Sequence, residues 1–148
     1  MKRKNYQGGD NMSRITLGDE KHEKGYSCSQ AVACVFCEEM GLDEETVFKL
    51  NEGFSAGMAD MEGVCGALSG AAMVIGMINS TANLENPDSK PETLKIVREL
   101  VAKFREQNGS TICKELKGVE TGTALRSCAG CIEDAIRLTE ETLEKMKQ

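Results

Sequence analysis

Cysteine is the residue type in this 148-residue chain whose number and spacing can carry chemistry. Cys65 has the most informative surroundings, because it lies in residues 63–70, where a glycine-rich loop is expected to turn into a helix. Backbone N–H groups and the positive end of a helix dipole favour a thiolate there, and the thiolate attacks disulfides and binds metals. The sequence therefore indicates thiol chemistry. The seven cysteines are Cys28, Cys34, Cys37, Cys65, Cys113, Cys128 and Cys131.

The other cysteines fall into two groups. Cys28 and Cys128 also stand at predicted helix starts, and Cys128 forms a C-x-x-C pair with Cys131. That spacing lets two sulfurs meet across one helical turn, as a redox dithiol or as two ligands of one metal ion. Cys34 and Cys37 are expected in mid-helix, where they either pack as small buried hydrophobes or extend the cluster around Cys28.

Composition excludes several classes of protein. A formal net charge of −6 argues against nucleic acid as a partner, because neutralising phosphates requires clustered Lys and Arg. No apolar run reaches the roughly 18–20 residues that span a bilayer, and the chain begins without the apolar segment of a secretory signal. We therefore expect a cytoplasmic protein that is not integral to a membrane, in a compartment where structural disulfides are uncommon.

Apolar residues recur at helical spacing along most of the chain, and no stretch shows sustained strand alternation. The pattern predicts an all-α fold, a compact single-domain bundle of about five to seven helices. Residues 1–12 are interpreted as a loose lead-in and residues 13–148 as one cysteine-rich helical domain. Helices are expected at 13–24 with an interruption at Gly18, at 28–40 after a Ser27 cap, from residue 43, at 65–79, 92–108 and 110–116, and at 128–145.

Glycines mark one face of the helix expected at 65–79. Gly66 and Gly70 are four residues apart and lie among alanines, so this face is thin. The thin face permits close packing of a neighbouring helix, or it leaves room for a ligand, a cluster or a second thiol beside Cys65. We treat Gly63, Gly66 and Gly70 as candidate cofactor-binding positions, and the same face also suits a homodimer contact.

Four segments in this order resemble the C_GCAxxG_C_C family of redox-active proteins: residues 25–32, 53–70, 109–118 and 128–135. The resemblance covers residues from about 20 to 145. It implies a small helical protein with four characteristic cysteines, here Cys28, Cys65, Cys113 and Cys128, with Cys131 as an alternative to the last. The family is similar to a domain of split-Soret cytochromes that is associated with an iron–sulfur centre. No C-x-x-C-H motif is present, so covalent haem is not expected.

We therefore expect a redox protein in which Cys28, Cys65, Cys113 and Cys128 converge as catalytic residues. Four thiolates are sufficient to hold an iron–sulfur cluster, or they form two exchanging dithiols with Cys65 as the nucleophile. The alternative is a structural or sensory zinc module whose candidate ligands include these four cysteines and Cys131. A third possibility is an interaction domain with inert cysteines. The sequence does not identify the redox partner.

Overall fold

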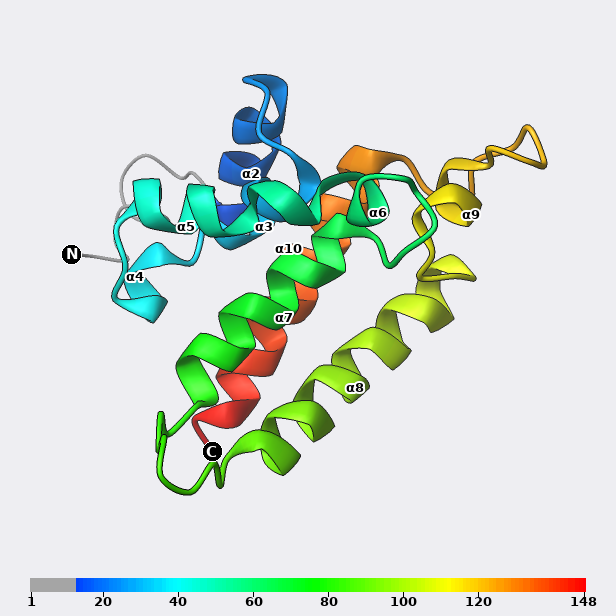
Figure 1. The fold of residues 1–148 in the computed structure, drawn as a ribbon. Helices are drawn as coiled ribbons and strands as arrows, with labels where there is room; N and C mark the ends of the chain where they lie inside the picture. Colours follow the sequence, from blue (N-terminus) through cyan, green and yellow to red (C-terminus); the bar gives the residue numbers. More distant parts are fainter. Residues whose placement is uncertain (1–12) are drawn as a thin grey trace.

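The computed structural model describes residues 13–148, and the lead-in predicted over residues 1–12 lies outside them. The described chain is a set of helices joined by turns, with one isolated antiparallel bridge between Val64 and Ile112, which confirms the all-α prediction (Figure 1). The helices are α2 (Arg14–Glu23), α3 (Cys28–Ala33), α4 (Cys37–Met40), α5 (Glu44–Asn51), α6 (Ser55–Met58), α7 (Gly66–Asn79), α8 (Lys90–Asn108), α9 (Cys113–Lys117) and α10 (Cys128–Met146), with a 3₁₀ turn η1 (Glu52–Phe54) before α6.

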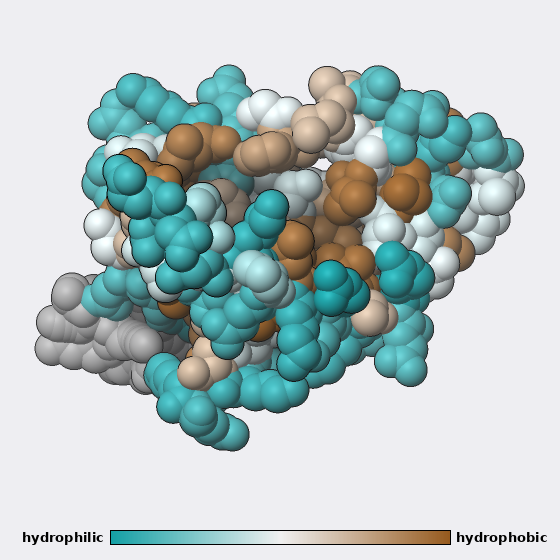
Figure 2. Space-filling view, turned by 60° about the horizontal axis from the view of Figure 1, so that its bottom comes forward, coloured by the Kyte–Doolittle hydropathy of each residue, from teal (hydrophilic) through white to brown (hydrophobic). Residues whose placement is uncertain are grey.

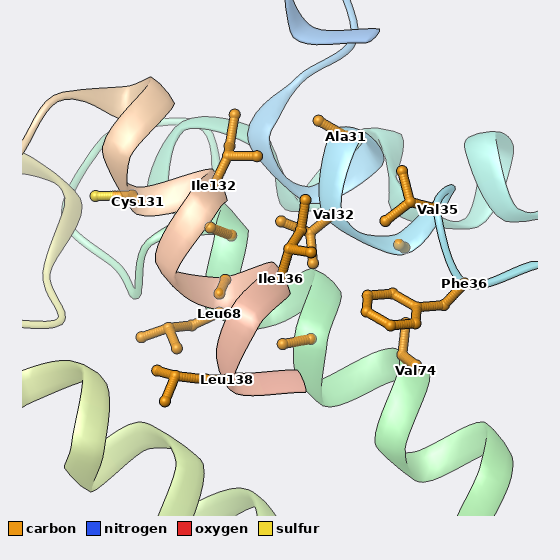
Figure 3. Packing of buried hydrophobic residues seen from close by; sticks show 14 of the residues in the cluster. Ala31, Val32, Val35, Phe36, Leu68, Val74, Cys131, Ile132, Ile136 and Leu138 are labelled. Carbon is orange, nitrogen blue, oxygen red and sulfur yellow. The ribbon is translucent and has the colours of Figure 1, made fainter. Parts of the chain in front are cut away.

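The core lies where α7 and α10 meet α2, α3 and α8. Helix α7 is apolar almost all round, which favours a central position, and it contacts both α3 and α10. Side chains from α3, α7 and α10 interdigitate in the interior, among them Val32, Leu68 and Ile136 (Figure 3). Cys131 points to the opposite side of α10 from Ile132 and Ile136 (Figure 3).

Hydrophilic residues cover most of the face drawn in Figure 2, and hydrophobic residues are exposed near its centre. The most exposed large apolar side chain in the described part of the chain is Leu84, at 90%. No helix among residues 13–148 has both the length and the apolar character needed to cross a membrane.

Serine caps fix the start of two of the helices that begin with a cysteine, α3 and α10. Ser27 forms a capping box with Gln30 at the start of α3, as its position predicts, and Ser127 accepts a hydrogen bond from Gly130 N–H at the start of α10. Such caps are worth about 1 kcal/mol each. They place Cys28 and Cys128 at the first helical position rather than in the preceding loop.

The helix expected at 28–40 breaks after Ala33, so the mid-helix position predicted for Cys34 and Cys37 is wrong. Residues 34–36 form a turn and α4 begins at Cys37. Tertiary contacts compensate for the interrupted helical hydrogen bonds: Arg14 Nε donates to Val35 O at 3.0 Å, and the guanidinium lies 4.6 Å from the centre of the buried Phe36 ring. Apolar periodicity continues through the break, which is why it did not reveal the turn.

Three other features differ from expectation. Helix α9 begins at Cys113 rather than Ser110, because Ile112 is extended (φ −91°, ψ 131°) and pairs with Val64 in the isolated bridge. Helix α2 runs through Gly18 without interruption, and the missing side chain of this glycine makes room for Ile136 of α10. Helix α8 begins at Lys90 rather than Glu92, with Pro91 in its first turn, where a missing N–H costs no helical hydrogen bond.

The thin face of α7 packs against the backbone of α3. A Cβ added to Gly70 would lie 2.6 Å from Ser29 O, and one added to Gly66 would lie 3.4 Å from Cys28 Cβ. The face is therefore used inside the chain, which removes the surface suggested for a homodimer, and the oligomeric state stays a prediction. The close approach brings the start of α3 beside the start of α7.

Replacing Gly70 by Ala should destabilise the protein, because the added methyl group meets α3 backbone that has no side-chain freedom to move away. We expect a loss of about 1–3 kcal/mol in the free energy of unfolding, measured by urea denaturation. Gly76→Ala in the same helix is the control. No atom would lie within 4 Å of its Cβ, so it should gain up to about 1 kcal/mol. Equal effects of the two variants would contradict the packing argument.

Candidate functional site

Cys65 is the N-cap residue of α7, as predicted. Its backbone N–H donates to Thr111 O at 2.8 Å, and its carbonyl accepts from Leu68 N at 2.9 Å. Its thiol also interacts with the backbone N–H groups of Ala67 and Leu68 in the first turn. Only 5% of the residue is exposed. The sulfur therefore occupies the anion-favouring position that the glycine-rich sequence indicated.

The segment formed by α6 and the loop from α6 to Cys65 contains several residues in left-handed conformation. Five residues that are not all glycine have positive φ in it: Ala56, Gly57, Met58, Ala59 and Met61. Each non-glycine residue in this region costs of order 1 kcal/mol, so the rest of the structure must hold the loop in place. Such strain recurs at functional sites, and here it lies immediately before the candidate nucleophile.

Backbone hydrogen bonds fasten this loop to the start of α9 and bring Cys113 to the site. Cys113 N donates to Gly63 O at 2.9 Å, and Lys114 N donates to Met61 O at 3.0 Å. Gly57 leaves no room for a side chain, because its missing Cβ would collide with Cys113 Cβ. Gly63 thus holds Cys113 through its carbonyl, while Gly66 and Gly70 admit α3 to the site.

Helix α10 contributes Cys128 and Cys131 from its first turn. The segment before it is fixed by Arg126, whose Nε lies 3.0 Å from Asp134 Oδ2 and whose Nη2 lies 3.1 Å from Asp134 Oδ1. Asp134 is buried, so this bidentate pair anchors the chain one helical turn beyond the cysteines.

Five cysteines thus come from four separate segments to one site: Cys28, Cys65, Cys113, Cys128 and Cys131. Four of them form two hydrogen-bonded pairs. Cys131 pairs with Cys65, and Cys28 pairs with Cys128. We call Cys65–Cys131 the inner pair, because both residues are buried, and Cys28–Cys128 the outer pair, because both are partly exposed. Cys113 is buried and interacts electrostatically with Cys65 and Cys128.

Cys65 is the site's preferred thiolate. The hydrogen bond from Cys131 outweighs burial and lowers the pKa of Cys65 to about 7, with further help from the N–H groups of Ala67 and Leu68 and from Lys117. The same hydrogen bond raises the pKa of Cys131, which is therefore the donor. Burial, followed by the charge of Cys65, raises the pKa of Cys28 to about 12. The site therefore favours a single thiolate, at Cys65, over several thiolates at once.

Lys117 supplies the cation of the site, and the sequence analysis did not identify it. Its Nζ donates to Cys128 Sγ at 3.7 Å, and the interaction with Cys128 raises the pKa of this lysine. Its spacing in the sequence could have identified it. Lys117 stands four residues after Cys113 in a segment expected to be helical, so both lie on one face of α9.

The donor set is entirely thiol, which suits soft metals such as zinc and iron–sulfur clusters. Among residues 13–148, however, no three His, Cys, Asp or Glu side chains are arranged to hold one metal ion. The cysteines interact in pairs instead. Cys34 and Cys37 do not join them and form a third pair elsewhere.

The pKa of Cys65 should rise when Lys117 is replaced by Met. Loss of the nearby positive charge destabilises the thiolate, by about one pKa unit or less for a lysine that is largely exposed. The measurement is the pH dependence of thiolate ultraviolet absorption in the reduced protein, with the Cys65→Ser curve subtracted. Wild type should show a transition near pH 7, with the thiolate forming as the pH rises through it.

Lys114→Met is the matched control, because Lys114 lies on the same helix but pairs with Glu62 and Glu120 rather than with a cysteine. It should leave the transition of Cys65 where it is. A transition that remains near the ordinary cysteine range in wild type would contradict the assignment of Cys65 as the thiolate.

Comparison with known proteins identifies the family of the chain. No similar protein was found among curated proteins or among solved structures. A family model described as "Putative redox-active protein (C_GCAxxG_C_C)" matches residues 26–142, which include all five cysteines of the site. Because the match covers most of the chain, the protein belongs to the C_GCAxxG_C_C family of redox-active proteins.

Proposed function

We propose that this protein catalyses thiol–disulfide exchange, with the outer pair meeting the substrate and the inner pair supplying the electrons. The observation that carries the proposal is the hydrogen bond from Cys131 to Cys65, which joins a low-pKa thiol to a second thiol within reach. A redox dithiol requires such an attacking thiolate and a neighbouring resolving thiol. The chemistry belongs in a reducing compartment, and we propose the cytoplasm.

Exposure determines the order of the two pairs. Cys65 and Cys131 are 5% and 2% exposed, so an incoming disulfide does not reach them directly. Cys28 and Cys128 are partly exposed, and Lys117 Nζ donates a hydrogen bond to Cys128 Sγ. The outer thiolate attacks the substrate disulfide and releases one thiolate, which takes up a proton. The second outer thiol then closes the Cys28–Cys128 disulfide and releases the other substrate thiolate, so two electrons pass to the substrate.

Transfer from the inner pair relies on the electrostatic proximity of Cys28 to Cys65. The Cys65 thiolate attacks the Cys28 sulfur of the outer disulfide, and Cys128 leaves as a thiolate beside the Lys117 ammonium group. A stabilised leaving thiolate speeds such a step. Cys131 then loses its proton and attacks the Cys65 sulfur, which forms the inner disulfide and frees Cys28. The outer dithiol is restored, and the inner pair has been oxidised by two electrons.

A second candidate function rests on Cys113. This cysteine belongs to neither hydrogen-bonded pair, yet it interacts with Cys65 and Cys128 from the same site. Cys28, Cys65, Cys113 and Cys128 are the thiols that would hold an iron–sulfur cluster, which supplies one-electron transfer. The same set with Cys131 would offer tetrahedral zinc a structural site without redox turnover. Either occupant requires the thiols to rearrange from pairs into one ligand shell.

The test is a map of disulfide-linked peptides from protein purified without oxygen and treated with oxidised dithiothreitol. Wild type should yield a Cys65–Cys131 link and a Cys28–Cys128 link. Cys65→Ser should lose the first link and keep the second. Cys28→Ser should form the inner link much more slowly, because the buried pair then lacks its route to the reagent.

Cys113→Ser separates the two candidate functions. Thiol–disulfide exchange predicts that this variant forms both links as wild type does, with no bound metal in either protein. A cluster predicts iron and visible absorption in wild type and their loss in the variant, while zinc at one per chain without iron indicates the structural site. Absence of both links in wild type would sink the exchange proposal.

A further inference from the structure

Cys34 and Cys37 lie apart from the functional site, at the other end of α3. Cys28 is the first residue of this six-residue helix and Cys34 is its C-cap, a separation of about 9 Å along the helix axis. The charged neighbours that act on Cys34 are Glu44 and Lys21 rather than any cysteine of the site. The two cysteines therefore form a separate thiol pair.

The break between α3 and α4 brings the two thiols together. Cys37 Sγ donates to Cys34 O at 3.4 Å, and the two side chains also hydrogen-bond to each other. The two residues stand in a C-x-x-C sequence, Cys34-Val35-Phe36-Cys37, which crosses the turn. The backbone at Phe36 is non-helical (φ −120°, ψ 21°), so this C-x-x-C lies on a turn that leads into a helix. The C-x-x-C spacing is one that redox dithiols use.

The two thiols are unequal in exposure and in acidity. Cys34 is 4% exposed, whereas Cys37 is partly exposed. The hydrogen bond between them lowers the pKa of Cys37 and raises the pKa of Cys34. An accessible thiol that ionises first and a buried thiol beside it are the attacking and resolving members of an exchange pair.

Polar groups next to the pair are held in a fixed arrangement. Glu44 Oε2 accepts from Lys21 Nζ at 2.7 Å and from Tyr26 Oη at 2.6 Å, and the Tyr26 ring packs edge-on against Phe48. The negative charge of Glu44 raises the pKa of both cysteines, and the positive charge of Lys21 lowers it by a smaller amount; Asp43 also raises the pKa of Cys37. The pair thus has a cation beside it without depending on the other thiol site.

We propose that Cys34 and Cys37 form a second redox-active dithiol, which exchanges with low-molecular-weight disulfides and closes into its own disulfide. The Cys37 thiolate attacks the disulfide and forms a mixed disulfide, and one substrate thiolate leaves and takes up a proton. Cys34 then loses its proton and attacks the Cys37 sulfur, which releases the second substrate thiolate. Two protein thiols are oxidised and one substrate disulfide is reduced. This proposal stands independently of the proposed function, because the two sites share no cysteine.

The test uses glutathione disulfide on the reduced full-length chain, with each cysteine read by mass spectrometry after differential alkylation. In wild type, Cys34 and Cys37 should become oxidised together as the ratio of glutathione disulfide to glutathione rises. Cys34→Ser should accumulate a glutathione adduct on Cys37. Cys37→Ser should leave Cys34 reduced and without an adduct, because that thiol is buried.

Three controls make the result decisive. Cys65→Ser should leave the Cys34–Cys37 disulfide unchanged even if the exchange at the inner pair is lost. Cys34→Ala is used if Cys34→Ser does not fold, as judged by circular dichroism. In urea, the adducts in Cys34→Ser and Cys37→Ser should become equal. No disulfide between Cys34 and Cys37 in wild type, or equal adducts in the two folded variants, would overturn the proposal.

Discussion

The close approach of α3 to α7 is the constraint on which the rest of the site depends. Glycine at positions 66 and 70 removes the side chains that would otherwise keep the two helices apart, and Ser29 backbone fills that space. Cys28 therefore comes within electrostatic range of Cys65, although the two are far apart in the sequence. The same contact serves packing and chemistry, since a side chain at position 70 would push α3 away from α7 and with it Cys28 away from Cys65.

Electrostatics then decides what so many thiols in one place can do. Several buried thiolates would repel one another in a region of low dielectric constant. The site therefore favours one negative charge, and the other thiols stay protonated. Cys65 takes that charge because Cys131 and the first turn of α7 donate to it, while burial holds the pKa of Cys28 and Cys113 above the ordinary value. A single preferred thiolate among protonated thiols suits stepwise exchange. When a second thiolate forms as a leaving group, it forms next to a cation such as Lys117.

Local sequence signals predicted the helical class, most helix boundaries and the seat of Cys65 at the start of α7, because caps, glycines and apolar periodicity act over a few residues. They did not predict the turn at residues 34–36, which depends on Arg14 of a different helix reaching the Val35 carbonyl. Nor did they assign Cys131 to Cys65 or identify Lys117. Tertiary packing of α7, α9 and α10 brings these residues together, and no local sequence pattern encodes that packing. Gly18 was misread for the same reason: it serves a contact with α10 rather than the geometry of its own helix.

Helix α3 links the two thiol sites through its shortness. It carries Cys28 at its first position and Cys34 at its C-cap, and both ends are fixed, the first by the Ser27 capping box and the second by Arg14. A continuous helix from 28 to 40 would keep Cys34 and Cys37 in a regular helical turn and would remove the non-helical backbone at Phe36. The same break also directs the chain so that the Phe36 side chain is fully buried against the core. The interruption that helps bury Phe36 thus also places two more sulfurs side by side, with Cys34 buried and Cys37 partly exposed.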